Sequence, residues 1–117
     1  MTAWPTAHQL ALSLPGSEAR DHFGSHSFHV NGKIFAQLSP QDRNAPLVIV
    51  KLSSADQTAL TLLDPETFSS PPQWGQHGWT SVLLSGVEQS MLHKLLIQSW
   101  RNVAPKKLIA SYPALSP

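Results

Sequence analysis

The chain of 117 residues contains no cysteine, which excludes disulfides, thiolate zinc sites and cysteine nucleophiles. Charged residues make up only 13% of it, whereas about a quarter is usual for soluble domains. No apolar run is long enough to span a membrane, and the N-terminus lacks a basic region followed by an apolar core. We therefore expect a soluble cytoplasmic protein whose surface consists largely of neutral polar side chains.

The length of the chain also limits its organisation. A chain this short can bury one hydrophobic core and has no room for two separate ones. Hydrophobic residues make up 41% of the sequence, which is enough to fill such a core and argues against disorder. We expect one domain over residues 1–117.

Acidic residues are missing after Glu88, although the net charge of the whole chain is only +1. Four of the eight cationic residues follow that position: Lys94, Arg101, Lys106 and Lys107. Two interpretations are open. Cations near the end of a helix complement its dipole and keep the surface soluble, and they can also attract an anionic partner.

Catalytic and metal-binding patterns are missing as well. The sequence has no Gly-rich phosphate loop, no Gly-x-Ser-x-Gly elbow and no closely spaced carboxylate pair, so we expect neither an enzyme nor a cofactor. His22, His26 and His29 lie close together, and imidazole is the commonest metal ligand. In a continuous strand His26 and His29 point to opposite faces, so we expect no metal site there.

The strongest structural signal that is present is the dipeptide Asn31-Gly32 between two strand-like runs. Both residues tolerate positive φ, as a two-residue type I′ hairpin turn requires. Such a turn pairs three positions across the hairpin: Val30 with Lys33, His29 with Ile34 and Phe28 with Phe35. We expect the face with Phe28, Val30 and Phe35 to meet the helices, and the face with His29, Ile34 and Ala36 to stay partly open.

The remaining elements follow from periodicity and capping signals. Helices are predicted over residues 5–13, over 54–63 with a capping box of Ser54 and Gln57, and from a second box of Ser85 and Glu88 to Pro105. The apolar side of the second helix is Leu60 with Leu63. The last helix carries an apolar stripe, which comprises Val87, Met91, Leu92, Leu95, Leu96, Ser99 and Val103.

Strands are predicted over residues 19–23, 47–50 and 79–84. Leu47 to Val50 is an unbroken apolar run, which is typical of a central strand that is covered on both faces. Residues 64–78 are predicted to be a long loop, and Ser111 to Pro117 a loosely ordered tail. The order of elements indicates an α+β fold, an antiparallel sheet with helices packed on one face.

The hairpin segment from Phe28 to Leu38 also carries a family resemblance. Together with Leu14-Pro15-Gly16, Lys51, Gly78-Trp79 and Ser99-Trp100, it resembles the MmcQ/YjbR family over nearly the whole chain. The resemblance implies a small domain with a fold similar to that of the bacterial frataxin homologue CyaY, and DNA binding through a double-wing motif. Iron binding does not carry over, because frataxins use dense acidic ridges and the carboxylates here are scattered.

The first function hypothesis is therefore a DNA-binding module without enzymatic activity. The cations available for phosphate contacts are Arg20, Lys33, Arg43, Lys51, Lys94, Arg101, Lys106 and Lys107. The two wings would be the Asn31-Gly32 hairpin and the segment from Asp64 to Gly78. The near-neutral total charge predicts a modest and sharply salt-dependent affinity.

The alternative hypothesis is an adaptor domain that binds a protein or a small ligand. Its contact surface would be the open sheet face with His29 and Ile34, or the Asp64 to Gly78 segment. Trp74 in that segment is a candidate contact for a base or a protein, while Trp79 and Trp100 are expected to fill the core. A continuous basic stripe would favour DNA, and an exposed apolar patch would favour the adaptor.

Overall fold

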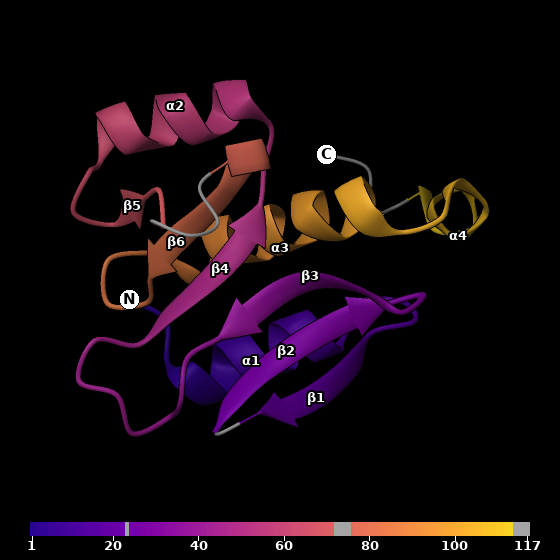
Figure 1. Ribbon diagram of the computed structural model, residues 1–117, viewed down its shortest axis with the longest axis horizontal. Helices are drawn as coiled ribbons and strands as arrows, with labels where there is room; N and C mark the ends of the chain where they lie inside the picture. The colour runs from indigo at the N-terminus through magenta and orange to yellow at the C-terminus, as the bar shows by residue number, and fades with distance from the viewer. Residues whose placement is uncertain (23, 72–75, 114–117) are drawn as a thin grey trace.

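The computed structural model describes residues 1–22, 24–71 and 76–113, and of His22 and Gln76 only the backbone (Figure 1). Its elements follow one another as α1 (Trp4–Leu12), β1 (Glu18–His22), β2 (Ser25–Val30), β3 (Lys33–Leu38), β4 (Leu47–Lys51), α2 (Ser54–Leu63), β5 (Phe68–Ser69), the 3₁₀ helix η1 (Gln76–Gly78), β6 (Trp79–Leu83), α3 (Gln89–Val103) and α4 (Lys106–Ala110). None of the helices in the described part of the chain combines the length and hydropathy that a membrane span requires.

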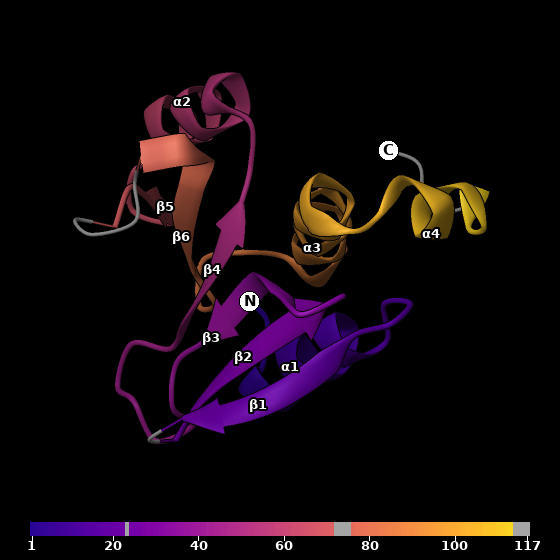
Figure 2. The same cartoon turned by 45° about the vertical axis from the view of Figure 1, so that its right-hand side comes forward.

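The six strands form one antiparallel sheet in the order β1-β2-β3-β4-β6-β5. Helices α1 and α3 pack on the same face, where their apolar side chains form one core with those of the strands. Helix α2 lies apart from them, beside β5 at the edge of the sheet (Figure 2). The predicted α+β class with an antiparallel sheet is confirmed.

The predicted hairpin turn is confirmed. Asn31 and Gly32 have φ angles of 53° and 77°, and Val30 pairs with Lys33. Phe28 and Phe35 are both fully buried on the helix-covered side, as expected.

The predicted register fails one step beyond His29 and Ile34. Phe28 pairs with Ala36 instead of Phe35, because a β-bulge inserts one extra residue into β3. The bulge resets the alternation along β3. Ala36, predicted on the open face, is therefore fully buried together with Phe35.

Strand β4 occupies the middle of the sheet, as predicted, but its side chains are fully buried on one face only. Val48 and Val50 are buried, while Leu47, Ile49 and Lys51 are half-buried. The apolar run of the sequence concealed this alternation, because Ile49 is apolar without facing the core.

Both predicted capping boxes are wrong. The side chain of Ser53, one residue earlier than expected, caps α2 by accepting a hydrogen bond from the Asp56 amide at 3.0 Å. Glu88 is the N-cap residue of α3 and makes no side-chain capping bond, and Ser85 lies in the turn before it.

The apolar faces of the two helices differ from each other. Leu92, Leu95, Leu96, Ser99 and Trp100 of α3 are buried, so most of the predicted stripe does face the core. Helix α2 has no buried residue, and Leu63, predicted on its apolar side, is 80% exposed. Local spacing identified the helices but could not show which of them the core would cover.

Three elements were not predicted. The segment expected to be a long loop contains β5, where Phe68 is buried and pairs with Val82, and then η1. A further short helix, α4, follows Pro105, which serves as its N-cap residue. Residues 114–117 of the predicted tail lie outside the described residues.

Candidate functional site

A cleft opens where β3 and β4 separate. Their ladder comprises Leu38–Val48, Gln37–Ile49 and Ala36–Val50, and beyond it the strands diverge in front of α3 (Figures 1 and 2). A cavity of about 370 Å³ lies at this divergence. The residues around it, here called the cleft, are Lys33, Ile34, Lys51, Trp79, Asn102 and Val103.

Helix α3 replaces the hydrogen bonds that the diverging strands can no longer make. The Ser99 hydroxyl donates to the Phe35 carbonyl of β3 and accepts from the Lys51 amide of β4 at 2.7 Å. The Asn102 side-chain amide donates to the Lys51 carbonyl at 2.9 Å. The amide and the carbonyl of Lys51 are thus both hydrogen-bonded to α3, which fixes the position from which its side chain extends at the cleft.

The wall that carries Trp79 depends on a close backbone contact. Gly78 has φ of 87°, and a Cβ at this position would lie 1.8 Å from the Leu52 carbonyl oxygen. The Leu52 amide donates to the Gly78 carbonyl at 2.9 Å. Trp79 follows, half-buried, with the Lys51 ammonium 5.9 Å from its ring centroid, within cation–π range. Trp79 therefore lines the cleft, whereas Trp100 is fully buried as predicted.

Several residues that carry the family resemblance make contacts between segments that are distant in sequence. Lys51 is held by Ser99, Gly78 positions Trp79, and the Trp100 indole donates to the Pro15 carbonyl at 2.8 Å. Of these residues, Lys51 and Trp79 line the cleft. Sequence reasoning missed Asn102, which has no local motif, although its neighbours Ser99 and Trp100 pointed to this helix.

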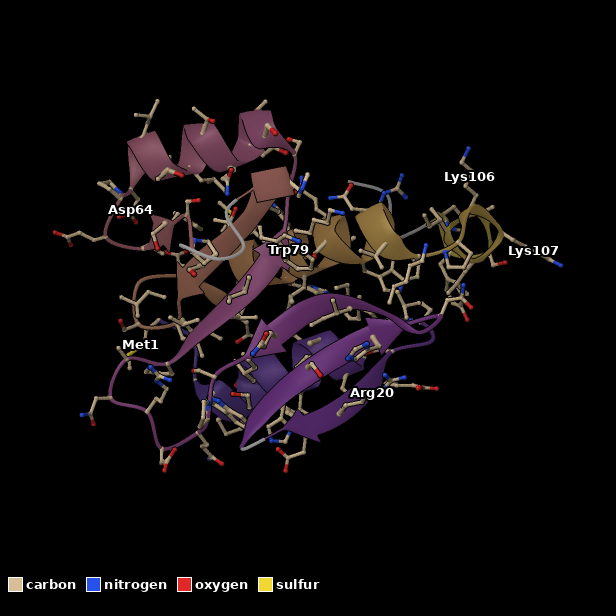
Figure 3. The ribbon with its side chains drawn as sticks, in the orientation of Figure 1. Met1, Arg20, Asp64, Trp79, Lys106 and Lys107 are labelled. Atoms are coloured by element: carbon tan, nitrogen blue, oxygen red, sulfur yellow. The ribbon has the colours of Figure 1, made fainter. Side chains whose placement is uncertain are left out.

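Two of the eight predicted phosphate-contacting cations line the cleft, and three more lie on the helices α3 and α4 that follow. Lys33 and Lys51 line the cleft, and Arg101 directly precedes its residue Asn102. Lys106 and Lys107 project from α4 at one extremity of the molecule (Figure 3). We call Lys33, Lys51, Arg101, Lys106 and Lys107 the cationic end.

Helix α4 is attached beside the hairpin, which brings its lysines to this end. A Cβ at Gly16 would lie 3.4 Å from the Leu108 side chain and 3.5 Å from that of Val30. Leu108 and Ile109 also pack against the core. Two carboxylates are close by, since Glu18 pairs with His29 on β1 and Asp56 lines a small pocket with Arg101.

The other three predicted cations do not line the cleft. Arg20 is exposed on the edge strand β1, and Arg43 is exposed in the loop at the far end of β3 from Lys33. Lys94 precedes Arg101 on α3 by about two helical turns and is exposed. Trp74, the candidate contact aromatic, lies outside the described residues.

His26 and His29 separate to the two faces of β2, as the alternation predicted, while the side chain of His22 lies outside the described residues. His26 faces α1, where its ring centroid lies 4.9 Å from that of His8 and 5.2 Å from that of Trp4. Burial, and to a lesser extent the charge of His26, lower the pKa of His8. Within residues 1–22, 24–71 and 76–113, no three His, Asp or Glu side chains are grouped so that they could hold a metal ion.

His29 lies on the open face with its Nε2 3.0 Å from the Ser27 hydroxyl. Burial and the nearby Arg20 charge lower the pKa of His29, while the Gly32 backbone and Glu18 oppose that shift. This face is half-buried and carries both signs of charge, since Glu18 and Arg20 pair with His29 and Ser27.

Two comparisons with known proteins found matches. The model of the family described as YjbR matches residues 12–102. Among solved structures, the Deinococcus radiodurans protein DR2400, whose domain is described as DUF419, superposes with a TM-score of 0.80. The two chains are 20% identical, and the match covers 98% of this chain and 88% of that one, which shows a common fold. No match was found among curated proteins.

Proposed function

The chain belongs to the YjbR family, and we propose that it is a DNA-binding module that catalyses no reaction. The observation that supports the proposal is the cationic end. Its five cations come from the hairpin, from β4 and from the C-terminal helices, and Glu18 and Asp56 are the carboxylates noted near them among the described residues. Separated cations on one surface suit the repeated phosphates of a nucleic-acid backbone.

The cleft suggests how DNA would be held. Lys33 follows the hairpin turn on one wall, and Lys51 stands on the other wall beside Trp79. A backbone phosphate between them could receive both ammonium groups. The hairpin and the η1 turn before Trp79 flank this position, which fits the two wings that the resemblance implies.

The low net charge of the chain predicts how strongly it should bind DNA. With a net charge of +1, the chain has little long-range attraction for DNA beyond the cationic end itself. Binding should therefore be weak at physiological salt and much stronger at low salt, because phosphate contacts release counterions.

Two triple variants with equal charge changes test the proposal. Lys33→Gln, Lys106→Gln and Lys107→Gln remove three cations from the cationic end. Arg20→Gln, Arg43→Gln and Lys94→Gln remove three from elsewhere. All six side chains are exposed, so both variants should fold. Affinity for a duplex and for a single strand would be measured by fluorescence anisotropy across a salt series.

The first triple should weaken binding for all sequences. It should also flatten the slope of log affinity against log salt by about 0.9 for each duplex phosphate that is no longer neutralised. The second triple should change both much less, although its net charge is the same. Equal effects of the two variants would show that total charge alone matters and would remove the assigned site. Absence of DNA binding by the wild type at low salt would overturn the function.

A further inference from the structure

Helix α2 leaves apolar side chains without a partner. It has no buried residue, and Leu62 and Leu63 are each 80% exposed. A helix of 10 residues gains most of its stability in proteins from packing an apolar face. Adjacent leucines left open on such a short helix therefore mark a surface suited to contact with another molecule.

An apolar groove of about 410 Å³ lies next to these leucines. It runs between the end of α2, strand β5 and the start of α3. Its apolar lining includes Leu60 and Leu63 of α2, the buried Phe68 of β5 and Met91 of α3. Met91 is 41% exposed, and its flexible thioether can adapt to different inserted side chains.

The charges around the groove are acidic. Asp64 and Glu88 line it, Glu66 is exposed between them in sequence, and no Lys or Arg side chain is among the lining residues. Asp64 lies at the opposite extremity of the molecule from Lys106 and Lys107 (Figure 3). The groove is therefore separate from the cationic end and has the opposite charge.

We propose that this groove docks a short amphipathic segment of a partner protein. The segment would insert one or two large aliphatic or aromatic side chains between Leu63 and Met91. Lys or Arg residues flanking these anchors would face Asp64 and Glu88. This inference does not depend on DNA binding, since it uses none of the same residues.

A second copy of the chain fits less well as the occupant. Its basic helix α4 is the natural candidate, but Leu108 and Ile109 of α4 already pack against their own core. Using them as anchors would require α4 to leave that position. A basic segment of another protein, whose apolar side chains are free to act as anchors, therefore fits the groove better.

Selection from a phage-displayed library of random twelve-residue peptides tests the inference on the intact wild-type protein. The expected enriched peptides combine large apolar residues with Lys or Arg. The strongest peptide would then be synthesised with a fluorophore, and its affinity measured by anisotropy. Leu63→Ser with Met91→Ser should weaken it by about tenfold or more, because interface anchors carry most of the binding energy.

Charge and location are tested by further variants. Asp64→Asn with Glu88→Gln should weaken the peptide several-fold and reduce its salt dependence. The matched control, Leu12→Ser with Asp42→Asn, alters an exposed leucine and an exposed carboxylate elsewhere and should leave binding unchanged. DNA affinity should be the same in the Leu63→Ser, Met91→Ser variant as in the wild type.

Three results would overturn the inference. One is that no common motif is enriched. Another is that the selected peptide binds the Leu63→Ser, Met91→Ser variant as tightly as the wild type while circular dichroism shows both to be folded. The third is a wild-type dimer, seen by sedimentation, that Leu63→Ser dissociates, because a second copy would then occupy the groove.

Discussion

The two walls of the cleft are stabilised in different ways. The hairpin wall, which carries Lys33 and Ile34, is stabilised by the packing of aromatic rings. The ring centroid of Phe28 lies 5.2 Å from that of His8 and 6.4 Å from that of Phe35. The opposite wall rests on backbone contacts between Gly78 and Leu52. Each wall contains a glycine with positive φ, yet a Cβ at Gly32 would meet nothing within 4 Å, whereas one at Gly78 would overlap a carbonyl oxygen.

The difference shows two distinct reasons why a position can require glycine. At Gly32 the turn geometry alone requires it, so the local sequence Asn-Gly is enough to predict the hairpin. At Gly78 the requirement also comes from Leu52, which follows β4 and is distant in sequence, so no local signal reveals it. Substitutions should therefore be tolerated unequally at two positions with similar backbone angles.

The largest effect is expected from Gly78→Ala. The new methyl group would overlap the Leu52 carbonyl at an unfavourable φ, so the backbone must shift and the hydrogen bond from the Leu52 amide must break. We expect a decrease of about 3 kcal/mol or more in the free energy of unfolding, measured with urea. Gly32→Ala is the matched control, because it places alanine at a positive φ without any overlap. An equal decrease for Gly32→Ala would contradict the argument that the contact with Leu52 causes the loss of stability.

Ser99→Ala removes the bridge between the two walls. The Phe35 carbonyl and the Lys51 amide would both be left without their partner, at a cost of about 1–3 kcal/mol for each group unsatisfied in the interior. Water that enters from the cleft would reduce this cost. Ser90→Ala, which alters an exposed serine of the same helix, should be nearly neutral. Similar stabilities for the two variants would show that the bridge is dispensable.

Gly32→Val tests the hairpin wall by itself. A β-branched residue resists the left-handed region, but nothing obstructs the side chain, so we expect stability to fall by about 1–2 kcal/mol. Gly32→Asn should be milder, because Asn tolerates positive φ. A decrease for Gly32→Val as large as that for Gly78→Ala would remove the proposed difference between the walls.

Sequence reasoning succeeded where a feature is local. The hairpin turn, the main helices and the central strand all follow from neighbouring residues. It failed where distant packing decides. The bulge at Phe35 depends on burying both Phe35 and Ala36. The choice of Ser53 over Ser54 as the cap failed for a local reason, because both serines have a suitable residue three positions later.

The candidate site shows the same limit. The sequence identified the eight cations but could not show which of them lie close together in the fold. Lys33 and Lys51 share a cleft only because β3 and β4 diverge, and α4 reaches the hairpin only because Leu108 packs beside Gly16 and Val30. The predicted quartet after Glu88 was therefore a mixture, since Lys94 precedes Arg101 on α3 by seven residues, whereas Lys106 and Lys107 belong to α4.

The smallest effect is a pH dependence of the hairpin wall. Burial lowers the pKa of His8 and of His29 in the folded state, so the unfolded chain takes up protons first as the pH falls. Stability should be constant above the ordinary histidine pKa and should decrease as the pH falls through it. His8→Gln should reduce this slope in urea unfolding measured between about pH 7 and 5, leaving the part due to His29. His93→Gln, which alters an exposed histidine of α3, should leave the slope unchanged. A slope unaffected by His8→Gln would show that protonation does not act on this wall through His8.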